Sequence, residues 1–248
     1  MLIQACLNGS RAPGEHPALP ITPEELAQAA ADAVASGAGA LHIHPRDAGG
    51  AQSLAAQDVG AALAAIRARC PGVPLGVTTA AWIEPEFERR LTLIYEWNEL
   101  PALPDYASVN FNEDGALDVC NALLAHGVGI EAGLGTLDDV ELLRTSGIAT
   151  RCLRLLIEME DDPADLALQL AEQMIQALDA ANIKTPRLLH GYEESTWAVL
   201  AAALRYGYDT RIGLEDTLCL PNGRQARDNA ELIAAARTLA QQAGRISS

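Results

Sequence analysis

The sequence predicts a single (β/α)8 barrel, also called a TIM barrel, that spans residues 1–248. Three observations favour this fold class. Short apolar runs rich in β-forming residues alternate with longer segments of helical periodicity, eight strand–helix pairs can be counted, and 248 residues is a typical length for such a barrel. The alternation indicates a parallel sheet with helical crossovers, and no linker or change of composition divides the chain.

The expected strands are the short apolar runs, which are connected through turns marked by glycine and proline. They cover residues 2–8, 40–46, 74–79, 106–112, 127–133, 152–159, 187–191 and 210–215. In a (β/α)8 barrel the carboxyl ends of all strands meet at one face, where active sites are built. Polar residues near these strand ends are therefore the first candidates for a functional site.

The expected helices lie between the strands. They cover residues 23–36, 56–70, 85–99, 116–126, 137–145, 163–181, 194–206 and 229–243. The first helix has the clearest start, because Thr22 can cap it, Pro23 suits its first position and Glu25 can complete a capping box. Pro85 and Pro163 are expected to begin two later helices in the same way.

A doubly wound open sheet is the alternative fold. Such a sheet would normally carry a glycine-rich dinucleotide-binding turn, GxGxxG, after its first strand. Residues 8–14 read Asn-Gly-Ser-Arg-Ala-Pro-Gly, which does not fit that pattern. The barrel is therefore the preferred interpretation.

Composition and charge exclude several classes of protein. The chain has 33 acidic residues against 17 basic ones, a net charge of −16, which disfavours binding to nucleic acid or to an anionic membrane. Its 49% of hydrophobic residues argues against disorder, and their spread in short runs argues against a membrane span. No secretory signal is visible, and the five scattered cysteines contain no CxxC pair, so we expect a cytoplasmic protein with reduced, mostly buried thiols.

The sharpest local motif is the run HIHPRD at residues 42–47. Because side chains alternate across a strand, His42, His44 and Arg46 are expected to share the inward face, while Ile43 meets the helices. Two histidines two residues apart can reach one metal ion, and imidazole suits zinc. The alternative is that these histidines are hydrogen-bonded core residues without a metal.

The last expected strand supplies a candidate for a third ligand. Alternation would place Arg211, Gly213 and Glu215 on one face, with Asp216 at the carboxyl end. An arginine next to two acids is difficult to explain by packing alone. The alternative is an ion pair between Arg211 and Glu215 that fills the barrel interior.

Other strand ends add polar side chains that are expected to face the same way. These are Thr78, Thr79, Ser108, Asn110, Asn112, Glu131, Glu158 and His190. Gly129 and Gly133 would leave room for a ligand beside Glu131. Together these residues predict a polar, partly charged pocket at one end of the barrel.

Several motifs together resemble the β-keto acid cleavage enzyme family. They are Leu-Asn-Gly at residues 7–9, the run HPALPITPEE at 16–25, HIHPRD at 42–47, GLED at 213–216, and LPNGR followed by DNAEL at 220–224 and 228–232. The resemblance covers nearly the whole chain. It implies a zinc-dependent (β/α)8 barrel, commonly a homo-oligomer such as a dimer or tetramer. It also implies a reaction in which a β-keto acid and acetyl-CoA give acetoacetate and a new CoA thioester.

The resemblance assigns roles to individual residues. His42, His44 and Glu215 become the ligands of Zn²⁺ or another divalent metal, Asp216 the acid/base group, and Arg211 its ionic partner. Thr78 and Ser108 fall at substrate-contacting positions. On physical grounds, we expect Arg211 to hold Asp216 ionised and ready to accept a proton.

Two departures from the family pattern bear on the substrate and on CoA. Arg11 stands where a glutamate meets a substrate amine, so an anionic or neutral substrate side chain is favoured, and Arg46 adds a second cation near the expected site. The acidic residues 160–162 replace a glycine-rich loop and would repel CoA phosphates. The alternative functions are a CoA-independent metal-dependent lyase or hydrolase on a small carboxylic acid, and a ligand-binding barrel without catalysis.

Overall fold

Eight parallel strands form a nearly closed barrel in the computed structural model, which describes residues 1–160 and 163–246. The strands are β1 (Ile3–Cys6), β2 (Ala40–Ile43), β3 (Leu75–Thr78), β4 (Tyr106–Asn110), β5 (Gly129–Leu134), β6 (Arg154–Met159), β7 (Arg187–Gly191) and β8 (Thr210–Ile212). Their order runs from β7 through β6 down to β1 and then β8. Strands β7 and β8 stand at the two ends of this order. Backbone hydrogen bonds from Leu189 to Asp209 and from Asp209 to Arg187 bring them together, so the barrel is nearly closed. The (β/α)8 prediction is confirmed.

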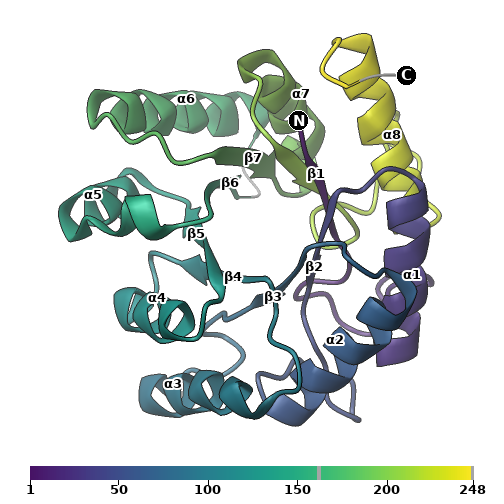
Figure 1. Cartoon of the computed structure of the whole chain (residues 1–248). Coiled ribbons are helices and arrows are strands. Elements are labelled where there is room, and N and C mark those ends of the chain that lie inside the picture. Colours follow the sequence, from purple (N-terminus) through teal and green to yellow (C-terminus); the bar gives the residue numbers. More distant parts are fainter. Residues whose placement is uncertain (161–162, 247–248) are drawn as a thin grey trace.

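The helices surround the strands, as Figure 1 shows. They are α1 (Pro23–Ala35), α2 (Ala56–Arg69), α3 (Phe87–Glu96), α4 (Ala116–Ala125), α5 (Leu137–Ser146), α6 (Ala164–Ala180), α7 (Thr196–Tyr206) and α8 (Asn229–Gln242), with short 3-10 turns at Trp97–Glu99, Ile148–Arg151 and Glu193–Ser195. Helix α1 begins as expected, with Thr22 and Glu25 forming a capping box around Pro23. Alanine and leucine dominate the core between helices and strands, in keeping with a chain that has only 4% aromatic residues.

The structure corrects several predicted element boundaries. Helix α3 begins at Phe87 with Glu86 as its cap, and α6 begins at Ala164 after Pro163, so neither proline occupies the first helical position. Strand β8 ends at Ile212, whereas we expected it to continue to residue 215. Glu215 therefore lies in the turn after β8, because the chain leaves the sheet as soon as its pairing with β1 ends.

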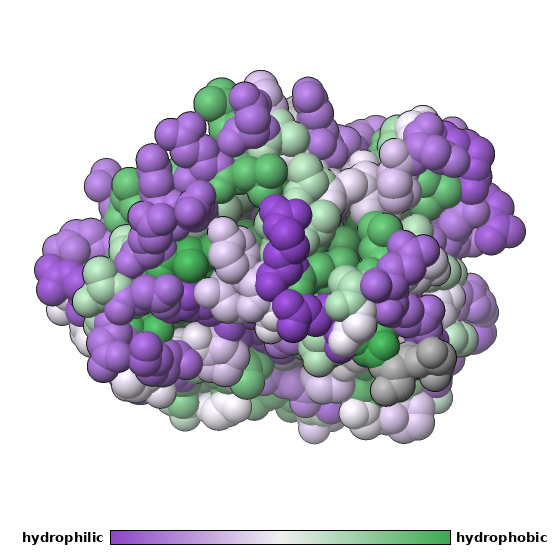
Figure 2. Space-filling view, turned by 90° about the horizontal axis from the view of Figure 1, so that it is seen from above, coloured by the Kyte–Doolittle hydropathy of each residue, from purple (hydrophilic) through white to green (hydrophobic). Residues whose placement is uncertain are grey.

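The surface reflects the composition. Figure 2 shows hydrophilic side chains over much of the face that it presents, with hydrophobic ones in small separate areas. No helix in the described ranges is both long and apolar enough to cross a membrane. Four of the five cysteines are buried, and Cys219 is exposed.

Candidate active site

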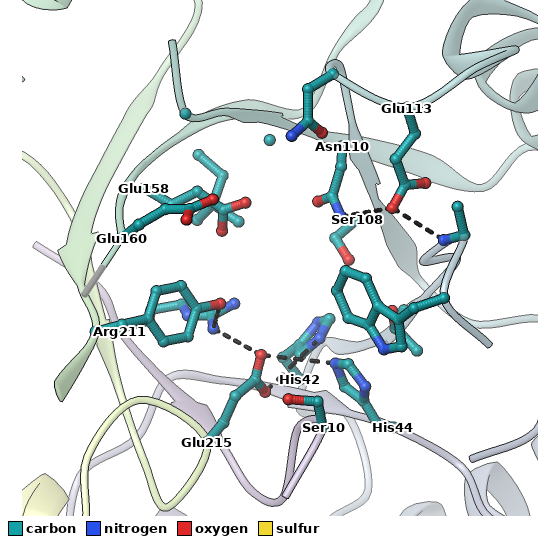
Figure 3. Close-up of a pocket in the computed structure, with 18 residues that line it drawn as sticks. Ser10, His42, His44, Ser108, Asn110, Glu113, Glu158, Glu160, Arg211 and Glu215 are labelled. Atoms are coloured by element: carbon teal, nitrogen blue, oxygen red, sulfur yellow. Dashed lines mark hydrogen bonds and ion pairs between the residues drawn. The ribbon is translucent and has the colours of Figure 1, made fainter. Parts of the chain in front are cut away.

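A polar pocket of about 510 Å³ opens at the carboxyl ends of the strands. Among the residues singled out from the sequence, those that line it include His42, His44, Thr78, Ser108, Asn110, Asn112, Glu158, Arg211 and Glu215. They come from β2, β3, β4, β6 and β8 and from turns that follow these strands (Figure 3). The end of the barrel that normally carries catalysis thus has a pocket with both acidic and basic groups.

Three side chains on one wall of this pocket could together hold a metal ion. They are His42, His44 and Glu215, and we call this group of potential ligands the metal cluster. One potential ligand atom from each lies within 4.8 Å of the others. The Nε2 atoms of His42 and His44 lie 3.9 and 3.6 Å from the two carboxylate oxygens of Glu215. Two nitrogens and one oxygen at this spacing suit zinc or another divalent ion, with room for a substrate to complete the coordination.

Neighbouring groups orient His44 with its Nε2 toward Glu215. Its Nδ1 lies 2.6 Å from the Oε1 atom of Gln52, an acceptor, so this nitrogen carries the proton and Nε2 keeps a free lone pair. Asn8 fixes the backbone of His44 through two hydrogen bonds of 2.9 Å. The ring of Trp82 stacks on the other side of the imidazole, with 6.3 Å between the ring centroids.

Electrostatics also fit a metal. Burial lowers the pKa of His42 to about 3, so its imidazole is neutral and available as a ligand at neutral pH. Burial acts to raise the pKa of Glu215, but the charge of Arg211, followed by the nearby rings of His44 and His42, acts against it and holds this pKa well below its usual value. Within the described residues, the buried Oε2 atom of Glu215 has no hydrogen-bond partner, so its lone pairs are available to a cation.

A buried ion pair lies next to the metal cluster. Arg211 donates to the Oδ1 atom of Asp216 from Nε at 3.0 Å and from a terminal nitrogen at 2.7 Å, and it also donates to Glu215 at 2.7 Å. Contrary to the expectation that Arg211 holds Asp216 ionised, burial raises the pKa of Asp216 to about 7 against the attraction of Arg211. Asp216 is fully buried, and Arg211 is the member of the pair that lines the pocket.

The opposite wall is held by Glu113. Its Oε1 accepts hydrogen bonds from the side chain of Asn110 at 3.0 Å and from the backbone of Ala81 at 2.9 Å, and its Oε2 pairs with buried Arg90 at 3.1 Å. These contacts fix the loops after β3 and β4 relative to each other. They explain why a carboxylate from a loop, which the sequence pattern did not single out, is part of the pocket wall.

Several residues predicted for the site have other partners. The guanidinium of Arg11 donates to the Leu214 carbonyl and pairs with Glu193, and that of Arg46 donates to backbone carbonyls of the loops after β1 and β2. Thr79 donates to the Ser108 carbonyl. The structure therefore does not place Arg11, Arg46 or Thr79 in the pocket lining.

Glu131 also lies away from the pocket, in a polar group that we call the interior cluster: Gln4, Tyr106, Glu131 and Arg154. Glu131 is fully buried and pairs with Arg154 at 3.0 Å and with Gln4 at 2.7 Å. Gly133 lines the pocket and Gly129 does not, but the space around Gly133 is closely filled by its neighbours and offers no room for a ligand beside Glu131. A β-carbon on Gly133 would approach Asn110 to 2.9 Å and Glu158 to 3.3 Å.

The sequence pattern missed several residues that line the pocket. Ser10, Trp82, Glu113 and Tyr192 come from loops, so strand alternation carries no signal for them. Glu158 lines the pocket from β6, as the sequence predicted, whereas His190, its neighbour on β7 and predicted to contact the substrate, is buried behind the pocket surface. Asp161 and Asp162 of the predicted acidic loop lie outside the described residues, whereas Glu160 lines the pocket.

The solved structures most useful for comparison share the fold. ObcA has been solved alone and with oxaloacetate. The structure without ligand matches with a TM-score of 0.69 at 20% identity, over 90% of this chain and 61% of that chain. The chain thus spans about three fifths of ObcA. The 3-hexulose-6-phosphate synthase from Salmonella typhimurium matches with a TM-score of 0.60 at 15% identity over 98% of this chain and 99% of that one. At these identities the likeness concerns the fold alone.

Sequence comparisons are more specific. A 3-keto-5-aminohexanoate cleavage enzyme from Fusobacterium nucleatum is 25% identical over 261 aligned residues, covering 99% of this chain and 93% of the relative. A second enzyme of this name, from Acetoanaerobium sticklandii, is 24% identical with the same coverage. The profile of the beta-keto acid cleavage enzyme family matches residues 1–247. With the metal cluster and the barrel in agreement, the chain belongs to the beta-keto acid cleavage enzyme family.

Proposed function

We propose that this enzyme is a zinc-dependent acyltransferase that condenses a β-keto acid with acetyl-CoA and releases acetoacetate and a new acyl-CoA. The observation that carries the proposal is the cluster of His42, His44 and Glu215 on the wall of a polar pocket at the carboxyl end of the barrel. Membership of the family supports β-keto acid cleavage as the reaction class. Zinc fits because two imidazoles and one carboxylate are a common catalytic ligand set for it.

The metal, when bound, would polarise the ketone of the substrate and orient it by binding its oxygens. The remaining lining residues bind the rest of a small carboxylic acid. Thr78, Ser108 and Asn110 offer hydroxyl and amide groups on neighbouring strands, and Asn110 is held in place by Glu113. Hydrogen bonds from such fixed groups select one orientation of the substrate carboxylate.

We assign the acid/base function to Asp216 and the role of its ionic partner to Arg211. A pKa of about 7 lets Asp216 both accept and release a proton near neutral pH. Among the described residues, Arg211 is the arginine or lysine that lines the pocket, so it is also the cation that an incoming carboxylate meets. Its hydrogen bonds to Asp216 and Glu215 link the proton-transfer group to the metal cluster.

The placement of Arg11 changes the expected substrate side chain. Its guanidinium is engaged by Glu193, while Ser10 faces the pocket instead. The argument for an anionic substrate side chain therefore loses its support. A neutral, polar side chain is compatible with the serine, threonine and asparagine groups of the lining.

The proposal is tested with purified enzyme loaded with Zn²⁺, a panel of β-keto acids and acetyl-CoA. We expect acetoacetate to form only when acetyl-CoA and a suitable β-keto acid are both present. His42→Gln and Glu215→Gln should lose metal and turnover together, because each removes one ligand. His126→Gln is the matched control, since His126 contacts Asn98 and Tyr95 near the surface. Full turnover in the ligand variants would overturn the proposal.

A second candidate function keeps the metal and omits CoA. Glu160 lines the pocket together with Glu158, and neither carboxylate would attract a phosphate group. A metal-dependent lyase or hydrolase acting on a small carboxylic acid would need no such attraction. Turnover of a β-keto acid at the same rate with and without acetyl-CoA would favour this candidate.

A further inference from the structure

Arg211 and Arg187 each pair with a tyrosine in nearly the same geometry. Arg211 donates to the Tyr192 hydroxyl at 2.8 Å, and its guanidinium carbon lies 5.4 Å from the centre of the tyrosine ring. Arg187 donates to the Tyr208 hydroxyl, also at 2.8 Å, and its guanidinium carbon lies 5.5 Å from that ring centre. The second pair lies at the amino end of the barrel, where β7 and β8 begin. Packing of an arginine on an aromatic ring stabilises both pairs, and of the two tyrosines only Tyr192 lines the pocket.

Several contacts fix Tyr192 at the pocket wall. Tyr192 directly follows β7, and its backbone N–H donates to the carbonyl of Met159, the last residue of β6, at 3.0 Å. Its own carbonyl accepts from the backbone N–H of Ser195 at 3.0 Å and from the Ser195 hydroxyl at 2.9 Å. The ring meets that of His190 edge to face, with 5.2 Å between the ring centroids. Together with Arg211, these neighbours hold the tyrosine hydroxyl in one position before any substrate arrives.

The Tyr192 hydroxyl can donate a hydrogen bond that the described part of the chain does not use. There it accepts from Arg211 and donates to no protein group. A hydroxyl has one donor position besides its acceptor positions, so it can accept from Arg211 and still donate elsewhere. Burial raises the pKa of Tyr192 well above its usual value, against the charge of Arg211, so the phenol keeps its proton at neutral pH. The hydroxyl is therefore a donor that is available to a molecule in the pocket.

One nitrogen of Arg211 connects this hydroxyl to the metal cluster. This nitrogen lies 2.8 Å from the Tyr192 hydroxyl and 2.7 Å from the Oε1 atom of Glu215. It also lies 2.7 Å from the Oδ1 atom of Asp216. Figure 3 shows Arg211 on the side of the pocket opposite Ser108. A substrate oxygen that binds at the metal cluster is thus within reach of the Tyr192 hydroxyl.

We propose that Tyr192 is a catalytic residue whose hydroxyl donates a hydrogen bond to the ketone oxygen of the β-keto acid. When Asp216 takes a proton from the methylene carbon, the electron pair of the broken C–H bond spreads onto this oxygen as an enolate, and the proton forms an O–H bond on Asp216. Tyr192 keeps its own proton throughout. The inference rests on the proposed function, because it takes a β-keto acid as the substrate and Asp216 as the base.

The arrangement suits the stabilisation of a developing negative charge. A fixed donor in a partly enclosed pocket needs no reorganisation when the charge appears on the oxygen that it faces. The hydrogen bond that Tyr192 accepts from Arg211 polarises its O–H group and makes it a better donor. Because Arg211 bonds to both Tyr192 and Asp216, it positions the donor and the base relative to each other.

The experiment compares wild-type enzyme with Tyr192→Phe, both loaded with Zn²⁺. Infrared spectroscopy measures the stretching frequency of a ¹³C-labelled ketone in the bound β-keto acid without acetyl-CoA, and acetoacetate formation with acetyl-CoA gives kcat. We expect a higher carbonyl frequency in Tyr192→Phe, because a hydrogen bond to the oxygen weakens the C=O bond. We also expect kcat to fall by about 10²- to 10³-fold, as for the loss of one donor to a developing oxyanion. Metal content should not change, because phenylalanine keeps the ring against Arg211 and His190.

Tyr208→Phe is the matched control. It removes the same hydroxyl from the same kind of arginine–tyrosine pair, at the amino end of the barrel and away from the pocket lining. We expect this variant to keep the wild-type carbonyl frequency and kcat.

The outcomes separate the inference from the proposed function. Either a wild-type carbonyl frequency or a wild-type kcat in Tyr192→Phe would overturn the inference while leaving the condensation reaction intact. A carbonyl frequency that depends on Tyr192, in an enzyme that forms no acetoacetate, would support the hydrogen bond and refute the acetyl-CoA reaction. Failure of the wild type to bind any β-keto acid would overturn both.

Discussion

Two polar clusters in the barrel interior use similar residues for different purposes. In the interior cluster, Gln4 donates to Glu131 at 2.7 Å and to the Tyr106 hydroxyl at 2.9 Å, and the Tyr106 hydroxyl donates to the Leu41 carbonyl at 2.5 Å. Arg154 pairs with Glu131 and lies over the ring of Tyr106. Every side chain of this group has a partner inside the group, and none of them lines the pocket of the described structure.

The metal cluster differs because its polar atoms face a cavity. His42, His44 and Glu215 lie together on the pocket wall, and their nitrogens and oxygens are 3.6 to 3.9 Å apart, too far for hydrogen bonds. The two clusters show that a buried charged residue indicates a binding function only when its polar atoms also face a cavity that a ligand can enter. We therefore expect substitutions in the interior cluster to change stability, and those in the metal cluster to change metal binding.

The largest effect is expected from Arg154→Ala. The substitution leaves Glu131 buried without its cation, and removing one partner of a buried ion pair typically costs about 3–5 kcal/mol. Urea denaturation should show this loss in the free energy of unfolding, while the folded fraction binds metal as the wild type does. A variant of normal stability that lost its metal would contradict the division between the clusters.

Removing the metal should produce a smaller loss of stability. A ligand that binds only the folded state stabilises it by about 2.7 kcal/mol at a free concentration 100 times its Kd. A chelator should therefore lower the melting temperature of the wild type and of Arg154→Ala in parallel. It should leave His42→Gln unchanged, because that variant has already lost a ligand. Thermal denaturation with and without chelator, at fixed protein concentration, makes the comparison.

The fold could be predicted from the sequence because each strand–helix unit repeats the same local pattern. The strands end earlier than predicted at β2, β4 and β8, where the chain turns away from its neighbours to build the pocket. Strand alternation nevertheless predicted that His44 and Glu215 face the same side as His42 and Arg211, although both lie beyond the last paired residues. Their spacing from His42 and Arg211 keeps them on the same side of the chain after the strand has ended.

The partners of inward-facing residues and the residues on loops could not be predicted from strand alternation. Glu131 and Glu158 both lie on inward faces of strands, yet the first meets Arg154 and the second meets the cavity. Whether an inward-facing glutamate pairs with an arginine or faces the cavity depends on the side chains of the neighbouring strands and not on the glutamate itself. Ser10, Trp82 and Tyr192 lie on loops whose paths are set by contacts with distant segments.

A change outside the ligand set tests how far the metal cluster extends. Gln52→Ala removes the acceptor that lies 2.6 Å from the Nδ1 atom of His44, so the ring loses the bond that fixes its orientation and its proton. Such partners of metal-bound histidines typically contribute about 10- to 100-fold in metal affinity. Competition with a metal-sensitive dye should show the weaker affinity. Gln176→Ala on α6 is the control, because Gln176 is exposed and contacts Glu172.

The smallest expected effect, per pH unit, comes from the protonation of His42 in metal-free enzyme. Its pKa is about 3 in the folded protein, below the usual 6.5, so the unfolded chain binds more protons between these two values. The stability that this residue contributes is therefore complete above pH 6.5 and is lost as the pH falls towards 3, at up to about 1.4 kcal/mol per pH unit.

The control is His42→Gln, which has no titrating group at this position. The difference between the unfolding free energies of the wild type and this variant separates the contribution of His42 from that of Asp216. Asp216 acts in the opposite direction, because its raised pKa of about 7 causes stability to be lost as the pH rises. A difference that stays constant between pH 6.5 and 4 would show that His42 is not held neutral by burial, which would remove one reason for regarding it as a prepared metal ligand.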